Sequence, residues 1–370
     1  MTEKSVQNLV THCLPKFRLS QIKTLAWVVL GCLKNPRGLI TEIARGCQGA
    51  TTLRHKLKRI HRFLSNSRID IEEHAQNLLN WLIARQGKLF VPLIAVDWTE
   101  EHGMKVLSFS FVWGRRSIPF YWHARKKGTL SRSQNSLESN AIRLLKSWMG
   151  GHRFILLADR GFHRTALVRA LGEKYGIEYV IRVMTTTHVK VKGHKGALGK
   201  LRVHTNKVRD FKKALYGDSA KVSVRLVVKK IKVKRQAKNK GKPDYSTWYL
   251  VTSLQNENKH QIVEYYERRY GIEASYRDWK TALGWRHQPH IINPERLSRY
   301  LLVLTVGMIC ALVVAESKKG QRKKYLVVLQ TSYDNPQTAS LVQCGIWLIQ
   351  SLSDRDTSLH IQKLFRIWGL

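Results

Sequence analysis

The order of the apolar runs between Lys88 and Val183 constrains the fold more strongly than any other feature of this chain. Five β-branched and aromatic runs predict strands, at 88–98, 104–114, 117–126, 153–162 and 177–183. Short polar turns join the first three runs, which predicts an antiparallel meander. Two helical segments separate the later runs, at Ser136–Met149 and Thr165–Lys174. The pattern therefore predicts an α/β sheet with helices packed on it.

Other regions flank or interrupt this sheet. In the first 85 residues apolar side chains recur every three or four positions, as in Leu19, Ile22 and Ala26, which predicts helices. At 221–242, Val alternates with Lys or Arg, which predicts a strand with one cationic side and then a basic loop. We predict five segments: a helical N-terminal domain at 1–85, an α/β core in two parts at 86–183 and 246–316, a basic β-rich insertion at 184–245, and a C-terminal helical region at 317–370.

The charge of the chain indicates a polyanionic partner. Lys and Arg number 65 against 25 Asp and Glu, which gives a formal net charge of +40. An excess of this size exceeds what solubility needs, and nucleic acid is the leading partner. Ribosomal and packaging proteins carry similar charge, but they are usually shorter and poorer in Trp than this chain, which has 11.

Cysteines and apolar segments favour a cytoplasmic protein without a membrane span. The five cysteines are scattered and form no CxxC pair, so neither a disulfide framework nor a zinc site is predicted. The N-terminal residues 1–12 lack the apolar core of a signal peptide. The stretch Leu301–Ala315 is apolar but shorter than a usual span, so we predict a buried helix there.

Two short segments near the N-terminus, at 39–46 and 51–66, could form a helix-turn-helix that reads DNA. Glycines at 46 and 49 permit a sharp reversal between them. The second segment places basic residues beside an apolar stripe of Leu53, Leu57, Ile60 and Leu64; the basic residues are Arg54, Lys58, Arg59, His61 and Arg62. An ordinary helical hairpin with a basic outer face is the alternative.

Two aspartates have similar positions, since Asp97 closes the apolar run 91–97 and Asp159 closes the run 154–159. Either one could cap a turn. Together with a third acid they could hold Mg²⁺, which takes oxygen ligands and leaves positions for water and phosphate. Two such ions, about 3.5–4 Å apart, assist phosphodiester displacement.

A third acid lies in the polar helix predicted at 265–281. Tyr266, Arg269, Glu273 and Lys280 follow one another at offsets of three, four and seven, which place them on one stripe of a helix. A solvated face with Glu–Arg and Glu–Lys pairs is the alternative reading of that stripe.

These residues resemble a known family. The spacing Y-x2-R-x3-E-x6-K matches the YREK signature of the DDE transposases of bacterial insertion sequences, of the insertion sequence four type. Asp159-Arg160-Gly161-Phe162 is similar to the motif that carries the second acid of that family. The resemblance covers about 88–316. It implies an RNase H-like catalytic domain with a β-rich insertion between the second and third acids, preceded by an α-helical DNA-binding domain and followed by C-terminal helices.

The resemblance also implies a role for each matched residue. Asp97, Asp159 and Glu273 would be the catalytic, metal-binding triad for two Mg²⁺ ions, with Mn²⁺ as a substitute. Arg269, Lys280 and Tyr266 would contact the DNA backbone. Trp248 matches a Trp that stacks a flipped base when the transposon end forms a hairpin. A core role is equally open for Trp248, and Trp279 and Trp285 are alternative positions.

The expected function is metal-dependent cleavage at transposon ends and strand transfer into target DNA by cut and paste, with a hairpin step open. The implied partner is double-stranded DNA, both terminal inverted repeats and target, bound by a homodimer at the bacterial nucleoid. A metal-dependent nuclease on the same fold and a noncatalytic DNA-binding protein are the alternatives. The segment 338–370 could form a dimer contact or pack on the core.

Overall fold

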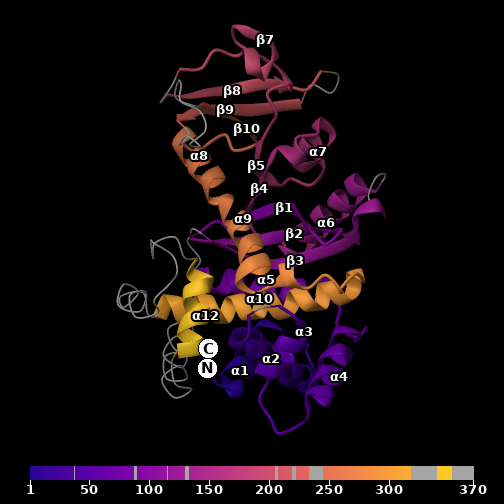
Figure 1. Cartoon of the computed structure of the whole chain (residues 1–370). Helices are drawn as coiled ribbons and strands as arrows, with labels where there is room; N and C mark the ends of the chain where they lie inside the picture. Colours follow the sequence, from indigo (N-terminus) through magenta and orange to yellow (C-terminus); the bar gives the residue numbers. More distant parts are fainter. Residues whose placement is uncertain are drawn as a thin grey trace, which may run out of the picture.

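A computed structural model describes most of the chain (Figure 1). The described residues are 1–36, 38–86, 90–114, 116–129, 133–204, 207–218, 222–232, 245–317 and 340–351. The basic loop predicted after residue 232 and most of the segment 338–370 lie outside them.

Five described helices precede the first strand. They are α1 (Glu3–Cys13), α2 (Leu19–Lys34), α3 (Ile40–Gly46), α4 (Leu53–Leu64) and α5 (Ile71–Gln86). α1 to α4 lie at one end of the molecule, and α5 lies next to the strand Arg116–Lys126 (Figure 1). Side-chain caps define two of their starts, because Thr2 accepts from the backbone N–H of Ser5 and Thr52 from that of His55. α2 packs on α1, α3 and α4, and its apolar residues are almost all buried, so it is the central helix of this group.

One mixed sheet runs through the rest of the molecule. Its strands are β1 (Leu93–Glu101), β2 (Met104–Trp113), β3 (Arg116–Lys126), β4 (Ile155–Ala158), β5 (Glu178–Arg182), β6 (His188–Val191), β7 (His194–Ala197), β8 (Val208–Tyr216), β9 (Val222–Lys232) and β10 (Tyr245–Thr252). Their order is β3-β2-β1-β4-β5-β10-β9-β8-β6-β7. β1, β2 and β3 are antiparallel neighbours, which confirms the predicted meander. β4 is parallel to both β1 and β5.

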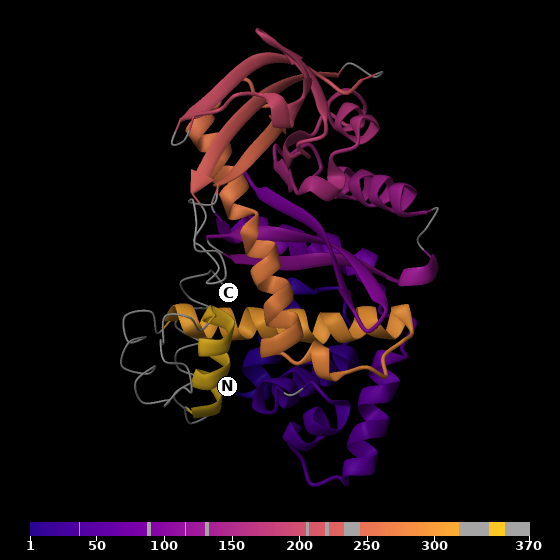
Figure 2. The same ribbon diagram turned by 45° about the horizontal axis from the view of Figure 1, so that its top comes forward.

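The strands after β5 lengthen this sheet and do not form a separate one. β10 pairs with β5 on one side and with β9 on the other, so residues 188–232 continue the ladder of the first five strands. Figure 2 shows these strands at the far end of the molecule from the N-terminal helices. The expectation for β9 was partly wrong: Val224–Val228 are all buried, including Arg225, so this stretch has no cationic outer side.

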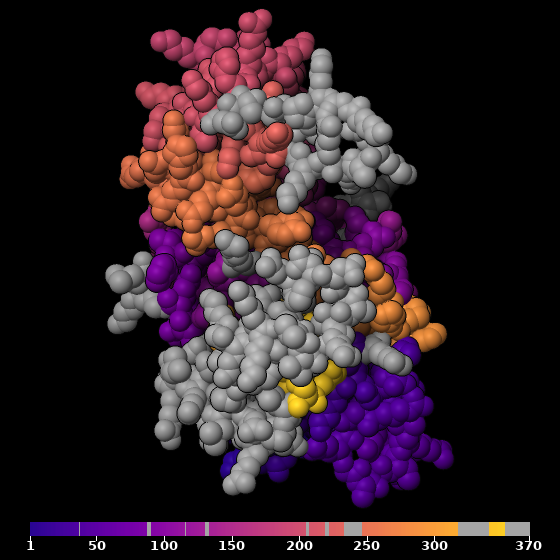
Figure 3. All heavy atoms as spheres, turned by 60° about the vertical axis from the view of Figure 1, so that its left-hand side comes forward, coloured from indigo at the N-terminus to yellow at the C-terminus, as the bar shows by residue number. Residues whose placement is uncertain are grey.

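Helices lie along the sheet. α6 (Gln134–Trp148) follows β3, and α7 (Thr165–Arg169), which continues as a π turn (Ala170–Lys174), follows β4. α8 (Lys259–Arg268) and α9 (Tyr270–Arg277) form one rod that crosses from the insertion strands to the meander (Figures 1 and 2). α8 packs on β5, β8 and β9, whereas α9 packs on β1, β2 and β3. In Figure 3 an orange surface lies between the insertion, at the top of the view, and the purple first strands below it.

The predicted single helix at 265–281 changes character at its end. After α9 the backbone makes a π turn (Asp278–Ala282). A π turn holds more residues than an α turn, so positions beyond it leave the α-helical stripe. Short 3₁₀ turns occur at Lys127–Thr129, Arg160–Phe162, Leu198–Lys200 and Trp285–His287.

Two C-terminal helices complete the core. α10 (Pro294–Ser317) lies between the N-terminal helices and β3, and α12 (Leu341–Ser351) packs on α10 and α2. α10 is long and apolar enough to cross a membrane, but 94% of its apolar window is buried inside the protein. This burial agrees with the predicted core helix. A Cβ at Gly345 would come within 1.9 Å of the Ala311 carbonyl oxygen, so α12 approaches α10 backbone to backbone. In its described part the C-terminal region therefore packs on the core.

Candidate active site

Asp97 and Asp159 lie side by side at two neighbouring parallel strands. The pairing of β1 with β4 ends at Val96 and Ala158, and each aspartate is the next residue of the chain. Asp159 follows the end of β4 and caps the 3₁₀ turn Arg160–Phe162, since its Oδ1 accepts from the N–H of Gly161 at 2.7 Å.

The sequence predicted that the first strand ends at Asp97, and this was wrong. β1 continues to Glu101 in its pairing with β2. Only the pairing of β1 with β4 stops here, just before Asp97. The two carboxylates thus stand where the sheet opens between these strands.

A close contact between α9 and β3 positions Glu273. A Cβ at Gly271 would lie 2.6 Å from Ser117 Oγ and 2.8 Å from the carbonyl carbon of Arg116, so only glycine fits here without displacement. The hydroxyl of Ser275 donates to the carbonyl of Ser117. The helix is therefore held against the sheet backbone on both sides of Glu273.

The guanidinium of Arg269 joins the acids. Its Nη1 donates to Oδ2 of Asp97 at 2.9 Å, and its Nη2 donates to Oε1 of Glu273. Arg269 is buried, with 7% of its surface exposed, and Asp159 adds to the charges that raise its pKa. Burial by itself would lower the pKa of this guanidinium, and Tyr266 together with the three acids raises it.

Negative charge is in excess at this site. Three carboxylates carry −3 and Arg269 carries +1, which leaves −2 in a chain whose formal net charge is +40. Burial raises the pKa of Asp97 to about 6, and the nearby Asp159 also raises it, against the lowering effect of Arg269 and of the Trp98 N–H. That N–H donates to Oδ1 of Asp97 at 2.7 Å. A second cation would relieve the excess charge.

The residues fit a divalent metal in chemistry and charge, with one rearrangement. Carboxylate oxygens are the ligands that Mg²⁺ and Mn²⁺ prefer. Within the described residues, however, no three His, Cys, Asp or Glu side chains are grouped closely enough to hold an ion together. Arg269 lies between the carboxylates of Asp97 and Glu273, and it must release them before an ion can take those oxygens. The five cysteines are buried, without disulfides, and contribute no thiolate site.

Trp248 and Tyr266 form an aromatic pair next to this site. Their rings meet edge to face with centroids 5.2 Å apart, and Tyr266 is buried while Trp248 is half-buried. Arg182 and Lys229 each lie 5.9 Å from the ring of Trp248. Burial raises the pKa of the Tyr266 phenol. Tyr266 thus supports the indole in this conformation, and its predicted DNA contact stays a prediction.

Lys280 is the last residue of the predicted stripe. It belongs to the π turn, and its Nζ donates to the carbonyl of Glu100 at 2.6 Å and lies 3.5 Å from the carboxylate of Glu101. Its predicted contact with DNA stays a prediction. Trp279 and Trp285, the alternatives to Trp248, are 0% and 1% exposed and cannot reach a ligand as they stand.

The basic residues of α4 face outward. Arg54, Lys58 and Arg62 are exposed, whereas Arg59 stacks on Trp27 with its guanidinium carbon 4.4 Å from the ring centroid. The predicted apolar stripe was partly wrong: Ile60 and Leu64 are buried, but Leu53 is 36% exposed. Phe63 is buried in its place, because the helix turns that side toward α2 and α10.

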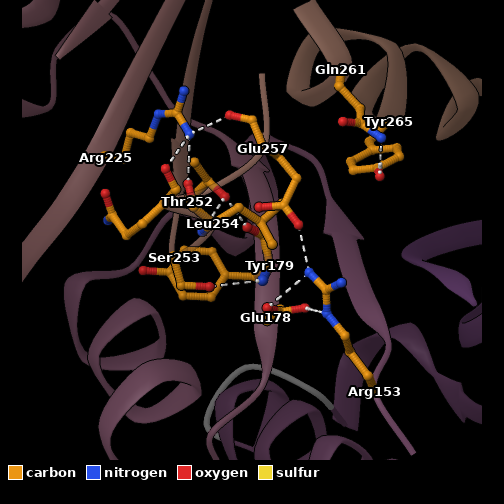
Figure 4. A network of polar contacts seen from close by, with 11 residues as sticks. Arg153, Glu178, Tyr179, Arg225, Thr252, Ser253, Leu254, Glu257, Gln261 and Tyr265 are labelled. Carbon is orange, nitrogen blue, oxygen red and sulfur yellow. Dashed lines mark hydrogen bonds and ion pairs between the residues drawn. The ribbon is translucent and has the colours of Figure 1, made fainter. Parts of the chain in front are cut away.

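A second buried arginine escaped the sequence analysis. Arg225 on β9 donates to both carboxylate oxygens of Asp210 and to three backbone carbonyls, those of Leu254, Gln255 and Glu257. Figure 4 shows how the adjacent Arg153 joins Glu178 to Glu257. We call Arg225, Asp210 and these carbonyls the Arg225 cluster. It fixes the loop between β10 and α8.

Comparison with known proteins finds similarity to transposases over part of the site. Residues 133–306 match the family model of the transposase DDE domain, a range that includes Asp159 and Glu273 and begins after Asp97. No curated protein sequence matches the chain. Among solved structures, a cryo-EM structure of the piggyBac transposase synaptic complex with hairpin DNA is similar at a TM-score of 0.43 and 11% identity, over 98% of this chain and 81% of that one. This similarity is too low to assign a fold.

Proposed function

We propose that this protein is a DNA transposase that cleaves DNA at transposon ends and transfers the strands into target DNA. One observation carries the proposal: Arg269 donates to both Asp97 and Glu273, and Asp159 lies near enough for its charge to raise the pKa of Asp97. The match of residues 133–306 to the transposase DDE domain supports the same reading of the second and third acids.

The order of the sheet supports an RNase H-like catalytic core. Three antiparallel strands followed by two parallel ones place Asp97 and Asp159 at the centre of the sheet, where such enzymes keep their acids. We propose the insertion sequence four type because the YREK spacing is complete in sequence. The five domain boundaries given above belong to the same proposal.

The carboxylates Asp97, Asp159 and Glu273 would hold Mg²⁺ or Mn²⁺, which supplies Lewis acidity at the scissile phosphate. Backbone N–H groups already orient two of these carboxylates, since Trp98 donates to Asp97 and Gly161 donates to Asp159. If Asp97 and Glu273 held metal, Arg269 would give up its bonds to both of them. Its planar fork then suits a phosphate of the bound DNA.

Basic and aromatic side chains would bind the DNA. The exposed Arg54, Lys58 and Arg62 of α4 suit backbone phosphates, and counterion release would make this binding salt-dependent. Trp248, half-buried between two cations, would stack a base at about 1–3 kcal/mol, which suits a hairpin intermediate of cut-and-paste transposition. We propose terminal inverted repeats as the substrate, a homodimer on the DNA and action at the bacterial nucleoid.

A cleavage and joining assay tests the proposal. The substrate is a duplex from the DNA that flanks the gene, which should contain inverted repeats, and the reaction is run with Mg²⁺ and a target plasmid. We expect cut and joined products from the natural protein and at least a roughly thousandfold loss for Asp97→Asn. Asp218→Asn is the control, because this exposed aspartate pairs only with His188 among the described residues.

Each other outcome selects an alternative. Cut product without joined product would indicate a metal-dependent nuclease. Cleavage that Asp97→Asn leaves unchanged would indicate a DNA-binding protein whose acids have no catalytic role.

A further inference from the structure

A buried tyrosine is hydrogen-bonded to the backbone of Asp97. Tyr276 is on α9, three residues after Glu273, and is 7% exposed. Its hydroxyl donates to the backbone carbonyl of Asp97 at 2.8 Å. The same hydroxyl lies 2.8 Å from Oγ of Ser108, which is fully buried and pairs with Asp97 across β1 and β2. Since the phenol has one proton and gives it to the carbonyl, Ser108 is the donor in the second bond.

This contact reaches the carboxylate through one peptide group. The carbonyl of Asp97 and the N–H of Trp98 belong to the same rigid plane. Tyr276 binds the oxygen of that plane, and the N–H on its other side donates to Oδ1 of Asp97 at 2.7 Å. The phenol therefore fixes the orientation of the group that orients the carboxylate.

Tyr276 also ties two acids to each other. Glu273 and Tyr276 are one turn apart on the same helix, so any movement of α9 that carries Glu273 also pulls on the Asp97 peptide. Burial raises the pKa of Tyr276 well above its ordinary value, so the phenol keeps its proton and remains a donor.

We propose that Tyr276 is a positioning residue that sets the separation of Asp97 and Glu273 for metal binding. The inference rests on the proposed metal-binding role of these acids. It assigns to Tyr276 a function that a core tyrosine, which only fills space and satisfies a carbonyl, would not have.

A matched tyrosine exists in the same protein. Tyr300 on α10 is 1% exposed, and its hydroxyl donates to the carbonyl of Gly38 at 3.0 Å. Tyr276→Phe and Tyr300→Phe each remove one buried hydroxyl from one backbone carbonyl. Only the first of these carbonyls belongs to the Asp97 peptide.

The test is a calorimetric titration of the full chain with Mn²⁺ alone, without DNA, together with thermal unfolding. We expect both variants to unfold at lower temperature than the natural protein. Tyr276→Phe should weaken Mn²⁺ binding about tenfold, the effect usual for a partner that orients a ligand, while Tyr300→Phe leaves it unchanged. Replacing Tyr276 by 4-aminophenylalanine, which restores a donor, should recover the affinity.

Equal Mn²⁺ affinity in the two Phe variants would overturn the proposal. Ser108→Ala is a further variant, because it keeps the bond from Tyr276 to Asp97. Affinity within about twofold of the natural protein is expected for it. A loss as large as that of Tyr276→Phe would mean that general repacking is responsible. If Tyr276→Phe does not fold, 4-fluorophenylalanine at position 276 takes its place, because it fills the space of the hydroxyl without donating to Asp97, and the same outcomes decide.

Failure of the proposed function would look different. In that case the natural protein would not bind Mn²⁺, or Asp97→Asn would bind it equally well. If both behave as expected and Tyr276→Phe matches Tyr300→Phe, only the positioning role is lost.

Discussion

Two buried arginines occupy opposite electrostatic settings in this protein. Arg225, 1% exposed, faces one carboxylate, that of Asp210, and gives its remaining bonds to neutral carbonyls. Arg269, 7% exposed, binds Asp97 and Glu273, and the charge of Asp159 also raises its pKa. The first site is balanced, one charge against one. The second has three negative charges for one positive charge.

The pKa values follow this difference. The bond from Arg225 lowers the pKa of Asp210, whereas burial raises that of Asp97 to about 6. Removing one partner of a balanced buried pair is strongly destabilising, because the other charge is left buried and unpaired. An unbalanced group of acids costs stability, and such groups are often found where a further cation binds. The Arg225 cluster is accordingly structural, and the acid site is the one that we propose to be functional.

The largest expected effect is a difference in the free energy of unfolding between variants of the two sites. Asp210→Asn leaves the Arg225 charge buried without its partner, so we expect unfolding to become easier by about 3–5 kcal/mol. Asp97→Asn removes a carboxylate that burial disfavours, and Arg269 keeps Glu273, so we expect no loss of stability at pH 7. Urea unfolding of both variants measures this. A larger loss for Asp97→Asn than for Asp210→Asn would refute the comparison.

A second prediction concerns Arg269 as a competitor of metal. Arg269→Gln frees the carboxylates of Asp97 and Glu273, so Mn²⁺ should bind about tenfold more tightly without DNA, or about 1.4 kcal/mol. Arg268→Gln is the matched control, because this neighbour pairs with Glu264 on the exposed side of α8 and changes the net charge equally. Weaker Mn²⁺ binding by Arg269→Gln would show that the guanidinium assists the metal and does not compete with it.

The smallest expected effect is on the pH dependence of the free energy of unfolding, to which Asp210 and Asp97 contribute in opposite directions. Asp210, whose pKa is lowered, gives stability that is complete above its ordinary value of 3.8 and is lost as pH falls through its folded value. Asp97, whose pKa is raised, favours the fold below 3.8, and this contribution is lost as pH rises to about 6. Each Asn variant should remove its own slope, at most about 1.4 kcal/mol per pH unit, in unfolding curves measured from pH 3 to 7.

Much of the site was predictable because its signals are local. The strand that ends on an aspartate and the offset between Arg269 and Glu273 are sequence patterns, and the structure joins these residues at Arg269. The π turn that contains Lys280 was not predicted, because no residue in its neighbourhood signals it. Arg225 was taken for a surface cation because the alternation of β9 does not show that another strand and a loop cover it. The proposed role of Tyr276 depends on its contact with the carbonyl of Asp97, 179 positions earlier in the chain. Residue spacing cannot reveal such a contact.

The close packing of α12 on α10 has a consequence for synthesis. α10 has a mean hydropathy of 2.2 over its apolar window, and α12, which covers part of it, begins only at Leu341. A nascent chain that has not yet released α12 from the ribosome therefore presents an apolar helix of span length without one of its covers. Until then the side of α10 that α12 covers stays exposed, and the backbone-to-backbone approach at Gly345 is what buries it.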